Sequence, residues 1–190
     1  MPMSWSGGGK WILLTLVDPQ TAQDVWALSF DGARKAIPLL QTAFTEGHPQ
    51  LSTDGKWILY ESNETGRSEI YVQSFPLGAG KWQISTNGGR FARWRRDSKE
   101  AFYMDAFSFG KIVAVGIKIT GSTLESEAPR PLFDSGYINA PNGHTGNWNT
   151  FAVSADGQRF LIPRPEAGVA NALTGTPITV MLNWTAAIKK

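Results

Sequence analysis

The sequence predicts an all-β chain that forms about four four-stranded antiparallel blades of a β-propeller, and therefore part of a propeller ring. Three observations lead to this fold class. A short turn phrase occurs four times, strand patterns follow each copy at similar offsets, and no helical periodicity separates the copies. Four strands per repeat, with nothing helical between them, fit few architectures other than a propeller.

The repeated phrase joins an apolar residue, a tight turn and a basic or polar residue. Its copies occupy residues 5–10, 51–56, 94–99 and 153–158. The apolar residue ends one strand, and an Asp-Gly pair then supplies the turn, because Gly and Asp tolerate the positive φ that a tight hairpin demands. The first copy departs from this pattern at Gly8, where Asp is expected, and the third at Ser98, where Gly is expected.

Each copy of the phrase leads into a series of predicted strands. Apolar second strands are predicted at 11–14, 57–60, 101–104 and 160–162. Third strands follow at 24–28, 69–73, 111–115 and 178–182. Shorter fourth strands are predicted at 36–40, 82–85 and 131–133, and the last repeat has no room for one.

The spacing of the phrase gives the blade boundaries. Counted from residues 6, 52, 95 and 154, the copies lie 46, 43 and 59 residues apart. The first two spacings suit a blade of roughly 40–50 residues, and the longer third indicates an insertion. We therefore expect a single propeller region over residues 1–190, with blades at about 1–48, 49–91, 92–150 and 151–190.

The second repeat, residues 51–85, resembles the repeat of TolB-like propellers, also called WD-like or PD repeats. The resemblance rests on the phrase Leu51-Ser52-Thr53-Asp54-Gly55-Lys56 and on the strand Glu69-Ile70-Tyr71-Val72. Residues 183–190 are similar to the end of larger bacterial proteins in which the propeller follows a serine/threonine kinase or a DNA-binding regulatory domain. The resemblance implies a signalling context, a periplasmic or otherwise extracytoplasmic location, and the C-terminal part of a longer propeller.

The blade count raises the question of ring closure. Native proteins rarely leave long sheet edges bare, and four blades alone make a narrow ring, although propellers of four blades occur. We expect partial rings to pair as a homo-oligomer that completes a larger ring. Independent closure of four blades is the alternative.

Composition argues against several function classes. The net charge of +2 gives no support for a nucleic-acid binder, and no apolar stretch approaches the roughly 20 residues of a membrane span. The absence of cysteine excludes disulfides, a thiol nucleophile and a Cys-ligated metal, and leaves the compartment open. Residues 90–96 mix Arg with aromatic residues as single-strand binders do, but they overlap the turn phrase, so a structural role is expected.

The insertion at residues 135–149 offers the best candidates for ligand binding, because function concentrates in loops on a rigid scaffold. Tyr137 and Trp148 are suited to stacking on a sugar or peptide, and Asn142 offers a donor and an acceptor. His144 lies in the same insertion, and His48 precedes the second repeat's first strand, where a loop or surface position is expected. These five residues are the predicted ligand-binding set. An ordinary solvated linker is the alternative for the insertion.

These features favour a non-enzymatic binding or sensory module that recognises a protein, a peptide or a small ligand. No catalytic residue, metal ligand or cofactor is predicted. The first alternative is a metal-assisted, lactonase-like hydrolase, which needs the two His residues and a carboxylate such as Glu46 or Asp134 around a metal in the channel. The second alternative is a structural self-assembly module.

Overall fold

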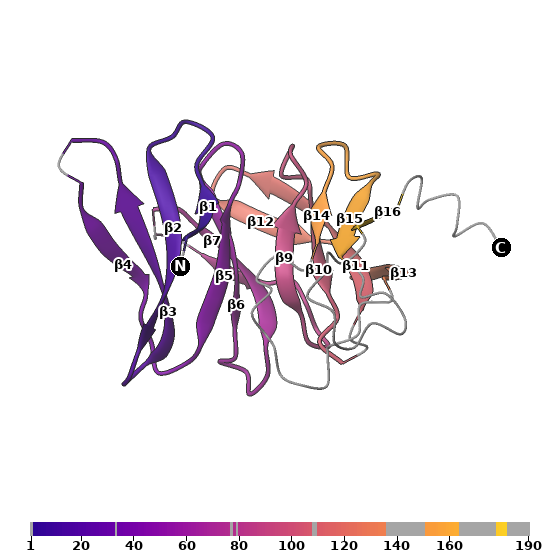
Figure 1. Ribbon diagram of the computed structural model, residues 1–190, viewed down its shortest axis with the longest axis horizontal. Coiled ribbons are helices and arrows are strands. Elements are labelled where there is room, and N and C mark those ends of the chain that lie inside the picture. Colours follow the sequence, from indigo (N-terminus) through magenta and orange to yellow (C-terminus); the bar gives the residue numbers. More distant parts are fainter. Residues whose placement is uncertain are drawn as a thin grey trace.

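The protein folds into β-sheets throughout the part of the chain that the structure describes. The computed structural model describes residues 2–32, 34–76, 78, 80–107, 110–135, 151–163 and 178–181. Every regular element in these residues is a strand, as predicted, and the strands form four antiparallel sheets (Figure 1). Among the same residues, no helix is long and apolar enough to cross a membrane.

The predicted strands occur in the predicted order, and the third sheet contains one strand more. The first sheet contains β1 (Pro2–Trp5), β2 (Trp11–Asp18), β3 (Ala22–Ser29) and β4 (Ala36–Leu40). The second contains β5 (Glu46–Leu51), β6 (Trp57–Ser62), β7 (Glu69–Ser74) and β8 (Lys81–Gln83). The third contains β9 (Arg90–Trp94), β10 (Glu100–Met104), β11 (Lys111–Thr120), β12 (Thr123–Ser126) and β13 (Arg130–Asp134). The fourth contains β14 (Ala152–Val153), β15 (Phe160–Pro163) and β16 (Ile178–Met181).

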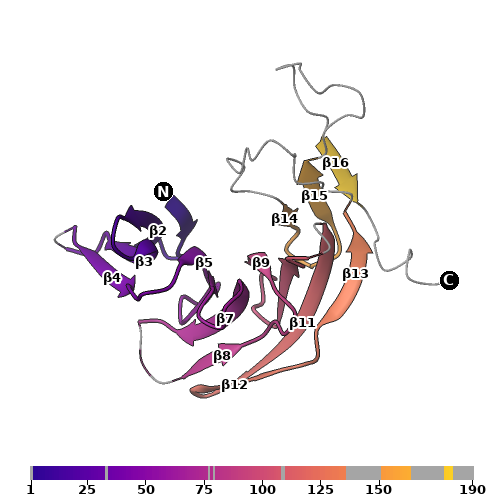
Figure 2. The same ribbon diagram turned by 90° about the horizontal axis from the view of Figure 1, so that it is seen from below.

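The four sheets, called blades 1 to 4 below, stand side by side in an arc. Figure 2 shows β1, β5, β9 and β14 on the inner side of this arc and the later strands of each blade toward the outside. Blades 1 and 4 lie at its two ends. This arrangement of antiparallel blades around an axis is a partial β-propeller, the predicted fold class.

The hydrophobic core lies between neighbouring blades. Three clusters of buried side chains fill the spaces between blades 1 and 2, 2 and 3, and 3 and 4. In the middle cluster, Leu59 of blade 2 packs with Tyr103 of blade 3, and both are buried. Because a strand points alternate side chains to opposite faces of its sheet, each inner blade can supply apolar residues to both of its neighbours.

The repeated turn phrase has the same geometry in all four blades. In each, the fourth residue of the turn donates its backbone N–H to the carbonyl of the first residue at 2.9 Å. The donors have positive φ, from 57° at Ser98 to 74° at Gly157. Ser98 therefore adopts the left-handed backbone that glycine provides elsewhere, and the two departures from the phrase leave the turn unchanged.

Neighbouring turns also contact one another. The N–H of Thr53 donates to Ser98 Oγ at 3.3 Å, and its hydroxyl donates to the carbonyl of Arg96. In the turn of blade 1, Gly7 lies so close to the carbonyl of Thr53 that an added Cβ would be 3.2 Å from it. In the turn of blade 4, a Cβ on Gly157 would be 2.9 Å from the Arg95 side chain. The four turns thus form a continuous row at one end of the blades.

The third blade contains a strand that the sequence analysis missed. Strand β11 runs on past the predicted end at residue 115, and β12 pairs with this extension through the partners Ile117–Ser126 and Thr120–Thr123. Gly121, with a φ of 61°, makes the connecting turn. Part of the extra length of the third repeat is therefore this hairpin. The Gly121-Ser122 pair between two threonines, with Ile119 before them and Leu124 after them, was its signal.

Buried carboxylates stabilise the connections between blades, but not equally. Glu69, at the start of β7, is fully buried and accepts hydrogen bonds from Gly88 N at 3.0 Å, from Arg67 Nε at 2.7 Å and from the Ser85 hydroxyl. Its counterpart in blade 1 is Asp24, at the same position in β3. Asp24 accepts from Thr21 Oγ1 at 2.8 Å, and its Oδ1 has no hydrogen-bond partner among the described residues.

Glu46 of β5 lies beside this incompletely bonded aspartate. It accepts a hydrogen bond from the Thr42 hydroxyl, while its Oε2 is buried without a partner among the described residues. Burial raises the pKa of Glu46 above its ordinary value of 4.5; the Thr42 hydrogen bond opposes this rise and the charge of Asp24 adds to it. A carboxyl whose pKa is raised by folding favours the folded state only while it is protonated.

The substitution Glu46→Gln should therefore stabilise the protein at alkaline pH. The amide keeps an oxygen for Thr42, removes a buried charge and offers an N–H near Asp24, which should raise the free energy of unfolding by about 1 kcal/mol at pH 8. The stabilising effect of protonated Glu46 is fully present below pH 4.5 and lost as pH rises through its folded-state pKa, so the difference should vanish in acid. Urea unfolding across this pH range measures it. The control is Glu125→Gln at an exposed site, and equal curves for wild type and Glu46→Gln would contradict the prediction.

Candidate ligand-binding groove

The sequence predicts a loop or surface position for His48, and this prediction is wrong. His48 lies within β5 and is buried, with a φ of 50°. The pairing of β5 with β6 shifts register between Gly47 and Gln50, so His48 occupies a β-bulge. A bulge is created by pairing with the neighbouring strand, and the residue pattern of a single strand did not reveal it. Ligand binding by His48 stays a prediction, now for a buried residue.

The same bulge position recurs in the next blade, and the two bulges meet. Phe91 of β9 has a φ of 56°, and its ring packs edge-on against His48 with 4.7 Å between centroids. Glu61 of β6 joins both residues, since its Oε1 lies 2.8 Å from His48 Nδ1 and accepts the N–H of Phe91. Burial works against ionisation of Glu61, but these contacts and nearby Arg90 outweigh it and lower its pKa. The cluster links blades 2 and 3.

The arginines of residues 90–96 have separate surroundings. Arg95 pairs with Asp97 at 2.7 Å and with Glu100 at 2.9 Å, and Arg90 lies 3.7 Å from Glu61. Arg93 packs over the ring of Phe151 in the neighbouring blade, 5.7 Å from its centroid. These contacts within and between blades agree with the structural role expected for the run. Arg96 differs, because it lines a groove.

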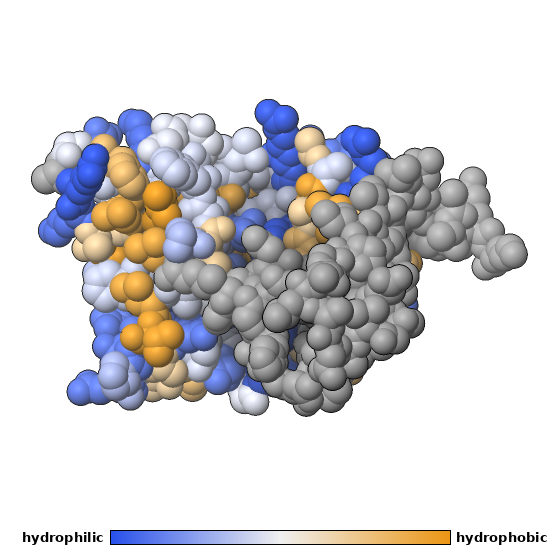
Figure 3. All heavy atoms as spheres, viewed as in Figure 1, coloured by the Kyte–Doolittle hydropathy of each residue, from blue (hydrophilic) through white to orange (hydrophobic). Residues whose placement is uncertain are grey.

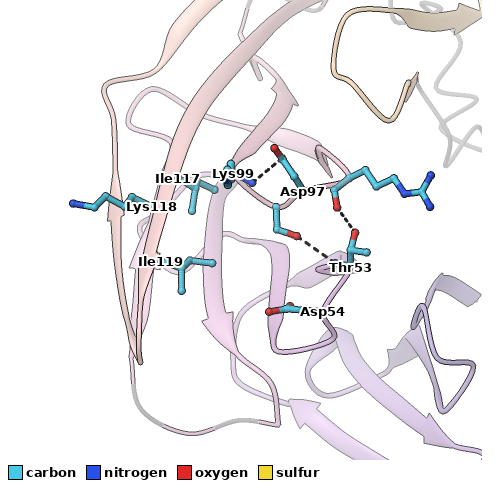
Figure 4. Close-up of a pocket in the computed structure, with 9 residues that line it drawn as sticks. Thr53, Asp54, Asp97, Lys99, Ile117, Lys118 and Ile119 are labelled. Carbon is cyan, nitrogen blue, oxygen red and sulfur yellow. Dashed lines mark hydrogen bonds between the residues drawn. The ribbon is translucent and has the colours of Figure 1, made fainter.

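This groove lies between the turns of blades 2 and 3 and the extension of β11. It has a volume of about 710 Å³ and is open to solvent. Its lining comes from three segments: the turn residues Thr53 and Asp54, the turn residues Arg96, Asp97, Ser98 and Lys99, and the strand residues Ile117, Lys118 and Ile119. In Figure 4, Ile117 and Ile119 point toward the turns, whereas Lys118 points away from them.

One side of the groove is an unpaired strand edge. Strand β10 pairs with β11 as far as Glu100 opposite Gly116, and the N–H of Ile117 then donates to the carbonyl of Lys99 at 2.8 Å. Beyond this point, among the described residues, β11 is paired only with β12 on its other side. Since the backbone groups of alternate residues point to the same edge, the N–H and C=O of Ile119 point toward the groove.

The charged side chains around the groove differ in whether they already have ion-pair or hydrogen-bond partners. Asp54 accepts the Lys56 N–H and the Ser52 hydroxyl, and Asp97 accepts the Lys99 N–H. The hydrogen bond from Arg95 is the main reason why the pKa of Asp97 is lowered. In the described part of the chain, the side chains of Arg96 and Lys99 form no ion pair. Among the described residues, Arg96 and Lys99 thus outnumber Asp54, the one carboxylate of the lining without an ion pair, and the groove carries an excess of positive charge.

The predicted binding residues Tyr137, Asn142, His144 and Trp148 lie outside the described residues. Sequence reasoning also missed the groove, because its three segments are distant in sequence and two of them are repeat turns with an evident structural role. The groove is formed because β11 extends beyond the residues that pair with β10. Within the described residues, no group of three His, Asp or Glu side chains is placed to hold a metal ion.

Comparisons with known proteins give the fold. Neither a protein-family model nor a curated protein sequence matches the chain. Among solved structures, it is similar to TolB from Acinetobacter baumannii, with 16% identity and a TM-score of 0.66 over 96% of this chain and 43% of that one. It is also similar to a nidogen/laminin complex, with 14% identity and a TM-score of 0.59, covering 96% of this chain and 59% of that one. A third similar structure is an oligogalacturonate lyase in complex with manganese, with 11% identity and a TM-score of 0.59, covering 96% and 50%.

These three proteins are each matched over only part of their length, so the chain corresponds to between 43% and 59% of them. At 11–16% identity the likeness concerns architecture, and the three neighbours differ in what they bind or do. The order of the blades, the row of repeated turns and the similar solved structures all indicate the same architecture. The chain has the fold of a partial TolB-like β-propeller.

Proposed function

We propose that this chain is a non-enzymatic recognition module that binds an extended segment of a protein or peptide in the groove between blades 2 and 3. The observation that carries this proposal is the unpaired edge of β11 beside the groove. An extended peptide can add to such an edge as a further strand, with main-chain hydrogen bonds supplying affinity and neighbouring side chains supplying specificity.

The groove lining supports a ligand of particular chemistry. Ile119, which is partly buried, offers an apolar surface that suits an apolar ligand side chain, and it lies beside Ile117, which is buried in the core between blades 2 and 3. Arg96 and Lys99 belong to the turn of blade 3 and form no ion pair among the described residues, whereas Asp97 is paired with Arg95, so the cations of the groove outnumber the one unpaired carboxylate, Asp54. We therefore expect a peptide with an apolar residue next to a carboxylate.

Two further expectations belong to this proposal. We propose that Tyr137, Asn142, His144 and Trp148, in the segment after β13, contribute to ligand binding, because aromatic and amide side chains in a polar segment suit stacking and hydrogen bonding. We also propose that a second copy of the chain completes the ring. The support for this is that the four described sheets form an arc and not a closed ring, so both of its end blades lack a neighbour on one side among the described residues (Figure 2).

The peptide-binding role can be tested with a phage-displayed library of random linear peptides. Selected peptides should be enriched in Asp or Glu beside an apolar residue, and Lys99→Glu should weaken their binding at least about tenfold through charge repulsion. The matched control Lys35→Glu changes an exposed lysine of blade 1 and should leave affinity unchanged. In NMR spectra of the protein with a selected peptide, the amide of Ile119 should become protected from exchange. Equal affinity for Lys99→Glu and wild type would exclude the groove.

The residues after β13 have their own test. Replacing Tyr137 and Trp148 by Ala should lower affinity for the selected peptides about tenfold without lowering the melting temperature, since the proposal assigns the contact area of these aromatic rings to the ligand and not to the core of the fold. Phe107→Ala, at an exposed aromatic of blade 3, is the control. Isothermal titration calorimetry and thermal unfolding measure the two quantities. Unchanged affinity of the double variant would reject the assignment of these two residues.

A further inference from the structure

The outward face of blade 1 is apolar and has no blade against it. Six residues define this blade-1 face: Trp5, Ile12, Leu14, Trp26, Leu28 and Phe30. Trp5 and Ile12 are direct cross-strand partners, as are Ile12 and Leu28, so their side chains share one face of the sheet. Figure 3 shows hydrophobic residues gathered over blade 1. Trp5 is 62% exposed and stacks on Phe30 with 5.8 Å between ring centroids.

The repeat shows what normally covers such a face. The residues of blade 2 that correspond to Trp5, Ile12 and Leu14 are Leu51, Ile58 and Tyr60, and all three are buried against blade 1. In blade 3, the counterparts Trp94, Ala101 and Tyr103 are buried against blade 2. The blade-1 face is thus a surface of the same kind, and the surface that fits it is the far side of another blade.

Blade 4 carries the complementary surface. Leu13, Leu59 and Phe102 occupy one repeat position in blades 1 to 3, and each is fully buried against the next blade. Their counterpart in blade 4 is Leu161, which is 42% exposed. The described ends of the arc therefore leave the two halves of one repeated interface uncovered, one on each terminal blade.

We propose that the blade-1 face of one copy packs head-to-tail against the Leu161 side of blade 4 in a second copy, and that two such contacts close a ring of eight blades. This inference rests on the proposal that a second copy of the chain completes the ring, and it identifies the two surfaces that would meet. The second copy is favoured over another occupant because the chain itself carries both halves of the repeated interface, and because propellers of up to eight blades are known.

The side chains at the edge of the proposed contact are compatible. Phe75 of blade 2 packs edge-on against Trp11 of blade 1, with 5.4 Å between centroids. Phe30 corresponds to Phe75, because both donate their backbone N–H to the lysine of the preceding turn. The residue of blade 4 that corresponds to Trp11 is Arg159, which is exposed. Phe30 would therefore face a guanidinium, a favourable partner for an aromatic ring.

Analytical ultracentrifugation of the 190-residue chain over a range of concentrations tests the proposal. Wild type should sediment with twice the chain mass. Trp5→Lys alone and Leu161→Glu alone should each raise the dimer dissociation constant at least about thirtyfold, because each change places a charge in both contacts of the ring. Val17→Glu, at a 78% exposed position on the other face of blade 1, should leave the dimer intact. Circular dichroism confirms that each variant is folded.

Mixing the two variants gives the decisive result. A Trp5→Lys chain and a Leu161→Glu chain together form one native contact and one contact with opposite charges, so heterodimers should reappear. A wild type that is monomeric at all concentrations would overturn the second copy as occupant. A dimer that survives Leu161→Glu but not Trp5→Lys would overturn the head-to-tail arrangement in favour of two blade-1 faces. If monomeric Trp5→Lys still binds the selected peptides, a failure of the assembly proposal does not affect the proposed binding groove.

Discussion

The packing of one blade face against the next is the interaction on which the rest of this structure depends. A single four-stranded sheet with apolar residues on both faces cannot exclude water from either face by itself. Stacking the sheets around an axis buries both, and the described hydrophobic clusters all lie between blades. The same requirement explains why the turn phrase recurs. Each turn sets the register of its first two strands and contacts the turns beside it, so the blades align with their apolar faces opposed.

Polar groups reinforce this stacking at the inner strands β5 and β9, where register shifts interrupt the regular backbone pairing. Bulges at His48 and Phe91 turn two backbone segments toward each other, and Glu61 accepts a hydrogen bond there from the Phe91 amide while contacting His48. Burial alone would favour the neutral acid, but the surrounding donors reverse the effect and lower the pKa of Glu61. Glu46 shows the opposite balance, because one hydroxyl donor does not offset burial beside another carboxylate. Two similar buried residues thus respond oppositely to pH.

Function in a propeller depends on the irregular parts, since the repeated parts are occupied by packing. The similar solved structures include TolB, a nidogen/laminin complex and a lyase with manganese, so this architecture serves different roles. In the present chain, the clearest departure from the repeat is the overhang of β11 with β12. It leaves one strand edge next to a groove in which unpaired cations outnumber unpaired carboxylates among the described residues, and the proposed recognition of an extended acidic segment rests on this local irregularity.

The sequence by itself determined the repeat, the strand order, and the turns, because strand alternation and turn chemistry are local properties that a few neighbouring residues decide. It did not place His48 inside a strand, reveal β12 as a separate strand, or bring residues 53, 97 and 119 around one groove, since these depend on pairing and stacking between distant segments. Ile12 and Ile58 make the distinction plain. They are the same residue type at the same position of the repeat, yet Ile58 is fully buried and Ile12 is only half-buried. Only the tertiary structure decides this, because burial requires a neighbouring blade.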